Sequence, residues 1–268
     1  MIKKAVLPVA GMGSRFLPAT KVIPKELLPI VDKPVVQYLV EEAVQSGIDD
    51  IIFVISPNKE LIRHHFSHHP ELEEFLLDRQ KHDLLDAIRP IHQMARFQFV
   101  YQDEPLGDGH AVLMAREAVG DEPFVVLFGD DIVKNKIPAA RQLMDHYDGN
   151  CVVAVTKIPK EQSVLYGMVE PGVSNGNRHT VLNMIEKPLP AEAPSDLGII
   201  GKYVCSPAIF DALLHVSGTK KTGEIRLIDA LNHLRATEGV TAVEIEGRRF
   251  DTGHPRGLAE AIMAYLED

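Results

Sequence analysis

Several common features are missing from this 268-residue sequence, and each absence excludes a class of protein. No apolar stretch reaches about 18 residues, the length that a membrane-spanning helix requires, and the N-terminus lacks the pattern of a signal peptide. With a net charge of -10, the chain also lacks the broad basic surface that sequence-independent binding to nucleic acid requires. We therefore expect a soluble, cytoplasmic protein that binds neither membranes nor nucleic acid.

Cysteine is scarce, with only Cys151 and Cys205 present. Both lie at or beside aliphatic runs typical of strands, where a thiol usually behaves as a small apolar side chain. We expect two buried free thiols rather than a disulfide or a metal pair.

Familiar catalytic motifs are also missing. Phe16 stands where a dinucleotide-binding fingerprint has its third glycine, and no Gly-Lys-Ser/Thr of a Walker A loop occurs. Neither a Gly-x-Ser-x-Gly elbow nor a Cys/His nucleophile pattern is present, which argues against a hydrolase. The segment His64–His69 contains four histidines, but it lacks a third ligand of suitable type and a His-Glu-x-x-His motif, so we do not predict a metal centre there.

Aliphatic strand patterns alternate with helical patterns in the first half of the chain. We expect strands at 2–9, 51–55, 97–101 and 124–128, with helices near 35–46, within 58–88 and near 109–119. This order is typical of a parallel sheet with helices on both faces. In the second half we expect helices near 138–146, 207–214, 227–235 and 257–266, and strands near 151–156, 168–170, 181–185, 199–204 and 240–245. No linker or repeat interrupts the pattern, so we predict one α/β domain over 1–268, with halves of about 1–132 and 133–268.

Residues 10–34 form the most informative segment, a glycine-rich turn followed by basic residues in an acidic chain. Gly11 and Gly13 allow the backbone to approach a phosphate closely. Arg15 adds a forked cation, and Lys25 adds a point charge, as do Lys21 and Lys33. Four prolines in 18–34 predict an extended loop that spaces these cations. A Gly-x-Gly-x-Arg sequence alone is compatible with an ordinary tight turn, but the long basic tail favours a phosphate-binding site.

Two acidic positions follow strand patterns. Asp130 comes directly after the run Phe124–Gly129, where a side chain can reach a Mg²⁺ ion that bridges phosphates, although an ordinary turn explains the same residues. Asp251 in the motif Arg-Phe-Asp-Thr-Gly is the natural second ligand. Two carboxylates suffice, because Mg²⁺ keeps waters and substrate oxygens as further ligands.

Two shorter segments carry weaker signals. Glu186 and Lys187 precede Pro188 at a strand end, where the carboxylate could accept from sugar hydroxyls and the ammonium could hold a phosphate. Gln102 follows the strand at 97–101, and its amide both donates and accepts, as the imide edge of uracil or thymine requires. Gly107 in the following turn allows close backbone contact with a base. Alone, Glu-Lys-Pro is more typical of a solvated turn, and the segment after Gln102 is more typical of a glycine-bearing loop that starts a helix.

Taken together, the motifs resemble the bacterial UTP-glucose-1-phosphate uridylyltransferases over about residues 2–265. In order they are AGMGSRFLPATKVIPKELLPIVDKP, QDEPLGDGHAV, FGDD, YGMVE, IEKP, SDLGIIGKYV, TGEIRLIDAL and FDTG. The first motif is by far the most specific. The resemblance implies a Rossmann-like mixed, mostly parallel sheet flanked by helices, and synthesis of UDP-glucose from UTP and glucose-1-phosphate with Mg²⁺. It also implies a homo-oligomer, either a dimer or a tetramer.

The resemblance also implies roles for single residues. The nucleotide-binding half would hold the triphosphate on Ala10, Gly11, Gly13 and Arg15, stabilise charge at the α-phosphate with Lys25, and bind uracil with Gln102 and Gly107. Asp130 and Asp251 would hold Mg²⁺. The sugar-phosphate-binding half would contribute Gly167, Glu186 and Lys187. Arg15, Lys25 and Asp130 would be the catalytic residues.

The sequence departs from this family at a few positions, which leaves alternatives open. Asp108, Asp196, Arg226 and Ile228 differ from the residues usual in the family, and Asp196 and Arg226 bear on the sugar pocket. Gly129 and Thr252 resemble the related thymidylyltransferases. A close alternative is therefore an enzyme that uses dTTP or another hexose-1-phosphate. A nucleotide-sugar-binding regulator without activity is a second alternative, but the retained Arg15, Lys25 and Asp130 argue against it.

Overall fold

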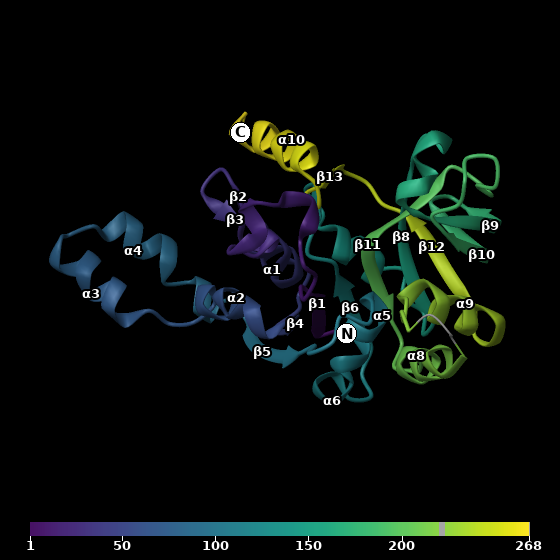
Figure 1. The fold of residues 1–268 in the computed structure, drawn as a ribbon, viewed down its shortest axis with the longest axis horizontal. Coiled ribbons are helices and arrows are strands. Elements are labelled where there is room, and N and C mark those ends of the chain that lie inside the picture. The colour runs from purple at the N-terminus through teal and green to yellow at the C-terminus, as the bar shows by residue number, and fades with distance from the viewer. Residues whose placement is uncertain (220–222, 268) are drawn as a thin grey trace.

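The computed structural model describes residues 1–219 and 223–267. Within them, one nine-stranded mixed sheet runs through both halves of the chain in the order β5-β4-β1-β6-β11-β8-β12-β10-β9 (Figure 1). The mixed α/β architecture predicted from the sequence is confirmed. Thr222, the first residue of one family motif, lies outside the described residues.

The first half forms the parallel part of the sheet. Its four strands are β1 (Lys4–Pro8), β4 (Asp50–Ile55), β5 (Arg96–Tyr101) and β6 (Phe124–Leu127). β1 pairs in parallel with β4 on one side and β6 on the other, so that Ala5 lies opposite both Ile51 and Val125. The carboxyl ends of these strands consequently meet at one edge, where parallel sheets bind ligands.

The second half continues the sheet mainly with antiparallel pairs. Its strands are β8 (Cys151–Lys157), β9 (Gly167–Asn175), β10 (Arg178–Glu186), β11 (Leu197–Cys205) and β12 (Val240–Glu244). β11 lies antiparallel between β6 and β8, and so joins the two halves, while β12 pairs in parallel with β8. Parallel pairing thus dominates the first half only.

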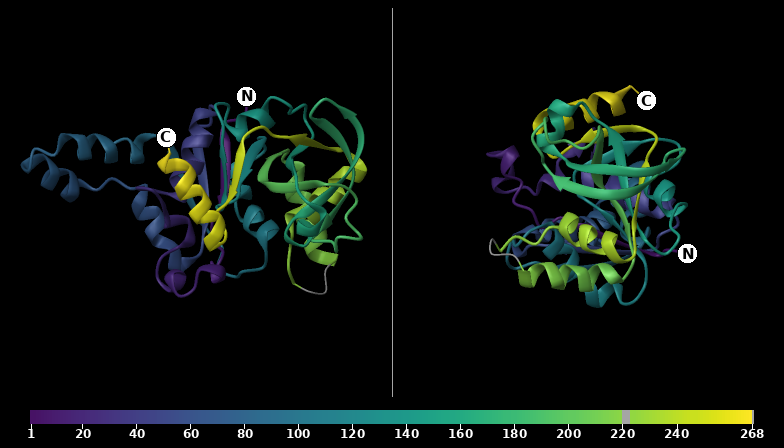
Figure 2. Two further views of the ribbon diagram at one scale, coloured as in Figure 1. Left: turned by 90° about the horizontal axis from the view of Figure 1, so that it is seen from above. Right: turned by 90° about the vertical axis from the view of Figure 1, so that its right-hand side faces the viewer.

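Helices cover both faces of the sheet (Figure 2). The helices are α1 (Val35–Gln45), α2 (Glu60–His65), α3 (Pro70–Asp78), α4 (His82–Ile88), α5 (Asp108–Met114), α6 (Arg116–Val119), α7 (Ala139–Met144), α8 (Ala208–Thr219), α9 (Leu227–Thr237) and α10 (Pro255–Leu266). Buried residues of α5, α8 and α9 form one core with one face of the sheet, and those of α1, α7 and α10 form a second core with the other. Figure 1 shows α3 and α4 extending away from the sheet.

The prediction of an extended loop over 18–34 is wrong. The segment instead begins with short 3₁₀ turns at Ala19–Lys21 and Lys25–Leu27, and a similar turn at Ser14–Phe16 precedes them. It ends in a small hairpin of β2 (Pro29–Ile30) and β3 (Lys33–Pro34). Proline fixes φ near -65°, a value that suits a tight turn as well as an extended chain. Backbone hydrogen bonds within the segment, such as that from Leu27 N–H to Pro24 O at 2.9 Å, stabilise the turns.

A second small sheet was not predicted from the sequence. It pairs β7 (Asp131–Lys134) antiparallel with β13 (Arg248–Asp251). Each strand is only four residues long, and its partner is far away in the sequence, so neither carries a clear periodic signal. This pairing brings Asp251 opposite Asp131.

Two further expectations concern cysteines and membrane spans. Cys151 and Cys205 are both free and buried, as predicted. None of the helices within the described ranges is long and apolar enough to cross a membrane.

A buried ion pair connects the central strand β11 to the helices on one face. Lys202 Nζ lies 2.7 Å from Glu42 Oε2 on α1, and Lys202 is fully buried. The other oxygen of Glu42 accepts a hydrogen bond of 2.9 Å from the backbone N–H of Ala140 at the start of α7. Both charges are therefore removed from water, and their mutual attraction offsets the cost of desolvation.

Replacing Lys202 with methionine should destabilise the protein by about 3 to 5 kcal/mol, because Glu42 would remain buried without its cation. The free energy of unfolding can be measured by urea denaturation. Lys3→Met is the matched control, since Lys3 pairs with Asp49 at the exposed surface, where an ion pair contributes little. Equal stability of the two variants would contradict a structural role for the buried pair.

Candidate active site

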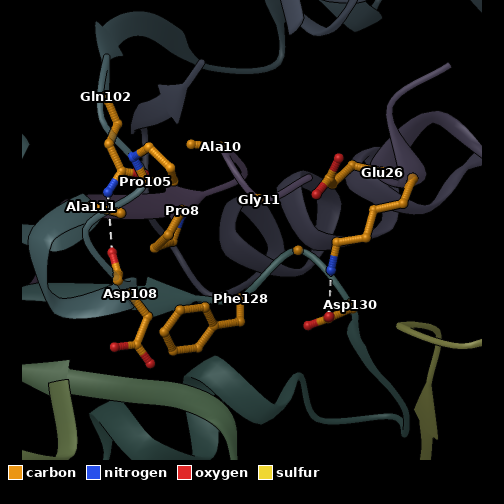
Figure 3. Close-up of a pocket in the computed structure, with 13 residues that line it drawn as sticks. Pro8, Ala10, Gly11, Glu26, Gln102, Pro105, Asp108, Ala111, Phe128 and Asp130 are labelled. Atoms are coloured by element: carbon orange, nitrogen blue, oxygen red, sulfur yellow. Dashed lines mark hydrogen bonds and ion pairs between the residues drawn. The ribbon is translucent and has the colours of Figure 1, made fainter. Parts of the chain in front are cut away.

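Two adjoining cavities lie at the carboxyl ends of the parallel strands. The first has a volume of about 290 Å³ and lies among the loops that follow β1, β5 and β6 (Figure 3). The second, of about 340 Å³, lies between those loops and the strands β9, β10 and β11. Asp108, Phe128 and Asp130 line both cavities, so the two form one cleft that spans the halves of the chain.

Most of the residues predicted from the sequence line this cleft. The first cavity contains Ala10, Gly11, Lys25, Gln102, Gly107 and Asp130. The second contains Arg15, Gly167, Glu186, Lys187 and Asp251, again with Asp130. Arg15 thus faces the second cavity, although it was predicted to bind with the glycines.

The two glycines of the first motif have different environments. A Cβ on Gly11 would meet nothing within 4 Å, so the backbone there is open to the cavity. Gly13 lies outside both cavity walls, and its φ of 66° is a conformation that favours glycine. Its Cα faces Lys25 Cβ and Thr20 Cγ2, each 3.3 Å from the position of a Cβ. Gly13 therefore shapes the turn around Lys25, and its predicted contact with phosphate stays a prediction.

Lys25 and Asp130 form an ion pair in the cleft. Lys25 Nζ lies 2.5 Å from Asp130 Oδ2, the contact dashed in Figure 3. Burial by itself would lower the pKa of Lys25, but the carboxylates of Asp130 and Glu26 outweigh it and raise that pKa. Burial likewise would raise the pKa of Asp130, yet Lys25, followed by Arg15, holds it below its ordinary value. Both groups are therefore charged at neutral pH.

A second ion pair adjoins the first, and the sequence did not reveal it. Lys59 Nζ contacts Glu26 Oε2 and the carbonyl oxygen of Val9, each at 2.7 Å. Burial raises the pKa of Glu26 and lowers that of Lys59, and both residues are almost completely buried. The signals available were an acid, Glu26, directly after Lys25 in the basic first motif and a lone lysine soon after the apolar strand at 51–55.

Asp130 and Asp251 converge on Gly253. A Cβ at this glycine would lie 2.6 Å from Asp130 Oδ2 and 2.9 Å from Asp251 Oδ1, so any side chain would fill the space between the carboxylates. Thr252 holds the two segments together, since its N–H and its hydroxyl both donate to Asp130 O, at 2.7 and 3.0 Å. Two carboxylates with open space between them suit a hard cation that also takes phosphate and water oxygens.

Glu186 and Lys187 both line the second cavity, although adjacent residues of a strand normally point to opposite faces. Lys187 follows the end of β10 with a φ of 48°, and its Nζ lies 3.0 Å from Glu186 Oε1. Gly167 lies opposite, where a Cβ would come within 3.3 Å of Glu186 Oε2. The turn thus brings a carboxylate and an ammonium together in one cavity.

Arg249 is a further cation in the second cavity that sequence reasoning missed. It forms an ion pair with Asp131 and lies over the ring of Tyr166, 4.8 Å from the centroid. Burial would lower its pKa, but Asp131 outweighs this effect and the pKa of Arg249 is raised. The signal was available, because Arg249 lies two residues before Asp251 on a strand and alternate residues share a face.

The positions that depart from the family have identifiable contacts. Asp108 Oδ1 accepts from the backbone N–H groups of Gly109, at 2.6 Å, and Leu227, at 2.9 Å, and thereby connects the starts of α5 and α9. Arg226 pairs with Glu224 at 2.8 Å. Among the described residues, the second cavity is lined by Ile228 but not by Asp196 or Arg226.

The histidine segment forms no metal centre in the described part of the chain, where no group of three or more His, Cys, Asp or Glu side chains is suited to a metal. His65 instead contacts Gln37 Oε1 at 2.9 Å, and His68 contacts Glu73 at 3.1 Å.

The depressed pKa of Asp130 predicts a specific acid response. The folded protein binds this proton less readily than the unfolded chain, so the stabilisation is present above the unfolded-state pKa, about 3.9, and is lost as the pH falls through the lower folded-state value. The difference in unfolding free energy between the wild type and Asp130→Asn should be constant near neutral pH and shrink below about pH 4. Urea denaturation from pH 3 to pH 7 measures it, and a difference independent of pH would contradict the ion pair.

Comparison with known proteins identifies the family of this chain. The nucleotidyl transferase family model matches residues 4–268. The UTP-glucose-1-phosphate uridylyltransferase of Bacillus subtilis (strain 168) is 44% identical over 266 residues, which cover 98% of this chain and 91% of that protein. The UTP-bound UGPase from Acinetobacter baumannii superposes with a TM-score of 0.92 at 38% identity, covering 100% of this chain and 95% of that one. A UDP-glucose pyrophosphorylase complexed with UDP-glucose gives a TM-score of 0.89 at 35% identity, covering 100% and 99%. The chain therefore belongs to the nucleotidyl transferase family and groups within it with the bacterial UTP-glucose-1-phosphate uridylyltransferases.

Proposed function

We propose that this protein transfers a uridylyl group from UTP to glucose-1-phosphate and releases UDP-glucose and pyrophosphate. The observation that carries the proposal is the shared cleft, because Asp130 lies between a cavity with Gln102 and Gly107 and a cavity with Glu186 and Lys187. Solved relatives with closely similar folds are described as UTP-bound or complexed with UDP-glucose, which supports the same pair of ligands here.

The chemistry requires alignment and charge neutralisation more than proton transfer. The phosphate oxygen of glucose-1-phosphate is already an anion, so it needs no strong general base to attack the α-phosphorus in line with the departing pyrophosphate. Repulsion between the anionic substrates is the main obstacle. Lys25 in the first cavity and Arg15 and Lys187 in the second provide fixed cations on both sides of the reacting phosphorus.

We propose Mg²⁺ as the cofactor, held by Asp130 and Asp251. When bound, the ion supplies positive charge and a template for phosphate oxygens. Lys25 Nζ contacts Asp130 Oδ2 at 2.5 Å. A Mg²⁺ ion held by this oxygen would replace that contact and leave Lys25 available for the α-phosphate.

The alternatives for the nucleotide receive no support from the two residues that suggested them. Gly129 is required by packing, because a Cβ there would lie 2.9 Å from Glu26 Cγ and 3.0 Å from Val9 Cγ1. Thr252 anchors Asp130. Gly129 is explained by its packing against Glu26 and Val9, and Thr252 by its hydrogen bonds to Asp130, so neither residue favours dTTP over UTP. We further propose a cytoplasmic homo-oligomer, dimer or tetramer, as expected from the resemblance.

Pyrophosphate release by the purified protein across four nucleoside triphosphates and several sugar-1-phosphates, with and without Mg²⁺, tests the substrates directly. We expect turnover with UTP and glucose-1-phosphate that is lost on chelation with EDTA and restored by Mg²⁺. A faster reaction with dTTP or with another hexose-1-phosphate would show that this compound is the substrate and would contradict the proposed pair. Tight nucleotide binding without turnover of any pair would favour a regulator.

Asp130→Ala should reduce turnover by roughly a thousandfold or more, which corresponds to about 4 kcal/mol at 1.4 kcal/mol per factor of ten. The variant removes one proposed ligand of Mg²⁺ and leaves Lys25 without its partner. Steady-state pyrophosphate release measures the effect. Asp148→Ala is the matched control, since Asp148 pairs with Arg178 at the surface and should keep full activity. Near-normal turnover of Asp130→Ala would exclude the assignment.

A further inference from the structure

The side-chain amide of Gln102 is held in one orientation by two acceptors. Its Nε2 donates to the carbonyl oxygen of Gly107 at 3.1 Å (Figure 3) and lies 2.9 Å from Nδ1 of His110. A carbonyl oxygen only accepts hydrogen bonds, so the NH₂ group of the amide has to face Gly107. Because the first N–H is used there, the second N–H is directed to the imidazole. Gln102 is also buried, which makes an unpaired N–H costly.

These contacts determine the state of His110. Nδ1 has to carry a lone pair to accept from Gln102, so the imidazole is neutral with its proton on Nε2. Burial lowers the pKa of His110 and thereby favours the neutral ring, although Glu104 acts in the opposite direction through its charge and its backbone. At neutral pH the imidazole is thus an acceptor toward the amide.

With both N–H groups engaged, the amide has its oxygen Oε1 left for a ligand. An oxygen accepts from the N3–H group of uracil or thymine, whereas cytosine has an acceptor at N3 and would be repelled. The orientation of one amide therefore decides which pyrimidine is recognised. A reversed amide would present N–H groups and favour cytosine.

We propose that His110 is a positioning residue for base selection, which acts by holding the Gln102 amide with its oxygen toward the base. This inference rests on the proposed function, since it assigns the first cavity to the pyrimidine. Among the described residues, that cavity is lined by Gln102 and not by His110. His110 therefore acts through Gln102 rather than by touching the ligand.

The surrounding backbone supports this role, because it fixes the other acceptor as well. Gly107 has a φ of 111°, and a Cβ there would lie 2.4 Å from Ile225 O. Ile225 in turn donates its N–H to Leu106 O at 2.7 Å and accepts from Gly109 N at 2.9 Å. The backbone at Gly107 is thus packed closely against Ile225, and the acceptor on His110 is the part of the arrangement that a side-chain substitution can remove.

Two substitutions separate positioning from simple packing. His110→Leu introduces a side chain of moderate size that has no acceptor, whereas His110→Asn can place its Oδ1 near the position of Nδ1. We expect His110→Leu to raise the KM for UTP about tenfold with kcat changed less than about threefold, and to lower the preference for UTP over CTP about tenfold. His110→Asn should recover most of both effects.

A double-mutant cycle tests whether the effect passes through Gln102. In a Gln102→Leu background, His110→Leu should cause no further loss of UTP preference, since the group that it positions is already absent. Additive losses in the cycle would overturn the inference, as would equal losses for His110→Leu and His110→Asn. Thermal unfolding of each variant serves as the control for folding.

Calorimetric titration with UTP and with CTP keeps this inference separate from the proposed function. Binding needs no turnover, so the UTP preference of the wild type and of His110→Leu can be compared even if the protein is inactive. An inactive wild type whose UTP preference falls in His110→Leu would contradict only the proposed reaction and would support the role of His110. A wild type that binds UTP no better than CTP would overturn the role of His110. A normal reaction with a UTP preference unaffected by His110→Leu would overturn it while leaving the proposed function in place.

Discussion

The arrangement of the cleft depends on two neighbouring ion pairs, one buried and one half-buried. Lys59 neutralises Glu26, which lines the first cavity, and Lys25 neutralises Asp130. Charges so close together in a poorly solvated region are stable only when each has a partner. Lys59 therefore holds the end of β1 through the carbonyl oxygen of Val9, and Asp130 holds Lys25. This arrangement places a cation and a carboxylate at the position where two substrates would meet.

Close packing explains why small residues are required around the cleft. Gly129 packs against Glu26, Gly253 leaves space for two carboxylates, and Gly107 packs against the backbone of Ile225. In each case a Cβ would collide with a group that serves the site. Strand β11 adds a second constraint, because it joins the two halves of the sheet and is anchored to α1 through Lys202. The two cavities are thus held in contact by one continuous sheet and not by a flexible linker.

Much of the fold was predictable, since long periodic segments report burial directly. The strands at 51–55 and 97–101 and the helix near 35–46 were predicted within a few residues of β4, β5 and α1. The short pair β7 and β13 was not predicted, because four-residue strands carry little periodic signal. The turns of 19–27 were mistaken for an extended loop, since proline permits both conformations.

The sequence alone determined which chemical groups are available: a glycine turn, cations in the first motif, carboxylates at Asp130 and Asp251, and the pair Glu186 and Lys187. It did so because these residue types have fixed charge and hydrogen-bonding capacity wherever they lie. Only the tertiary structure decided their partners. It placed Arg15 with the second cavity, gave Gly13 a role in the turn, added Arg249 and Lys59, and set His110 against Gln102. These contacts join residues from different loops, and their distances are set by strand pairing and packing that local sequence does not encode.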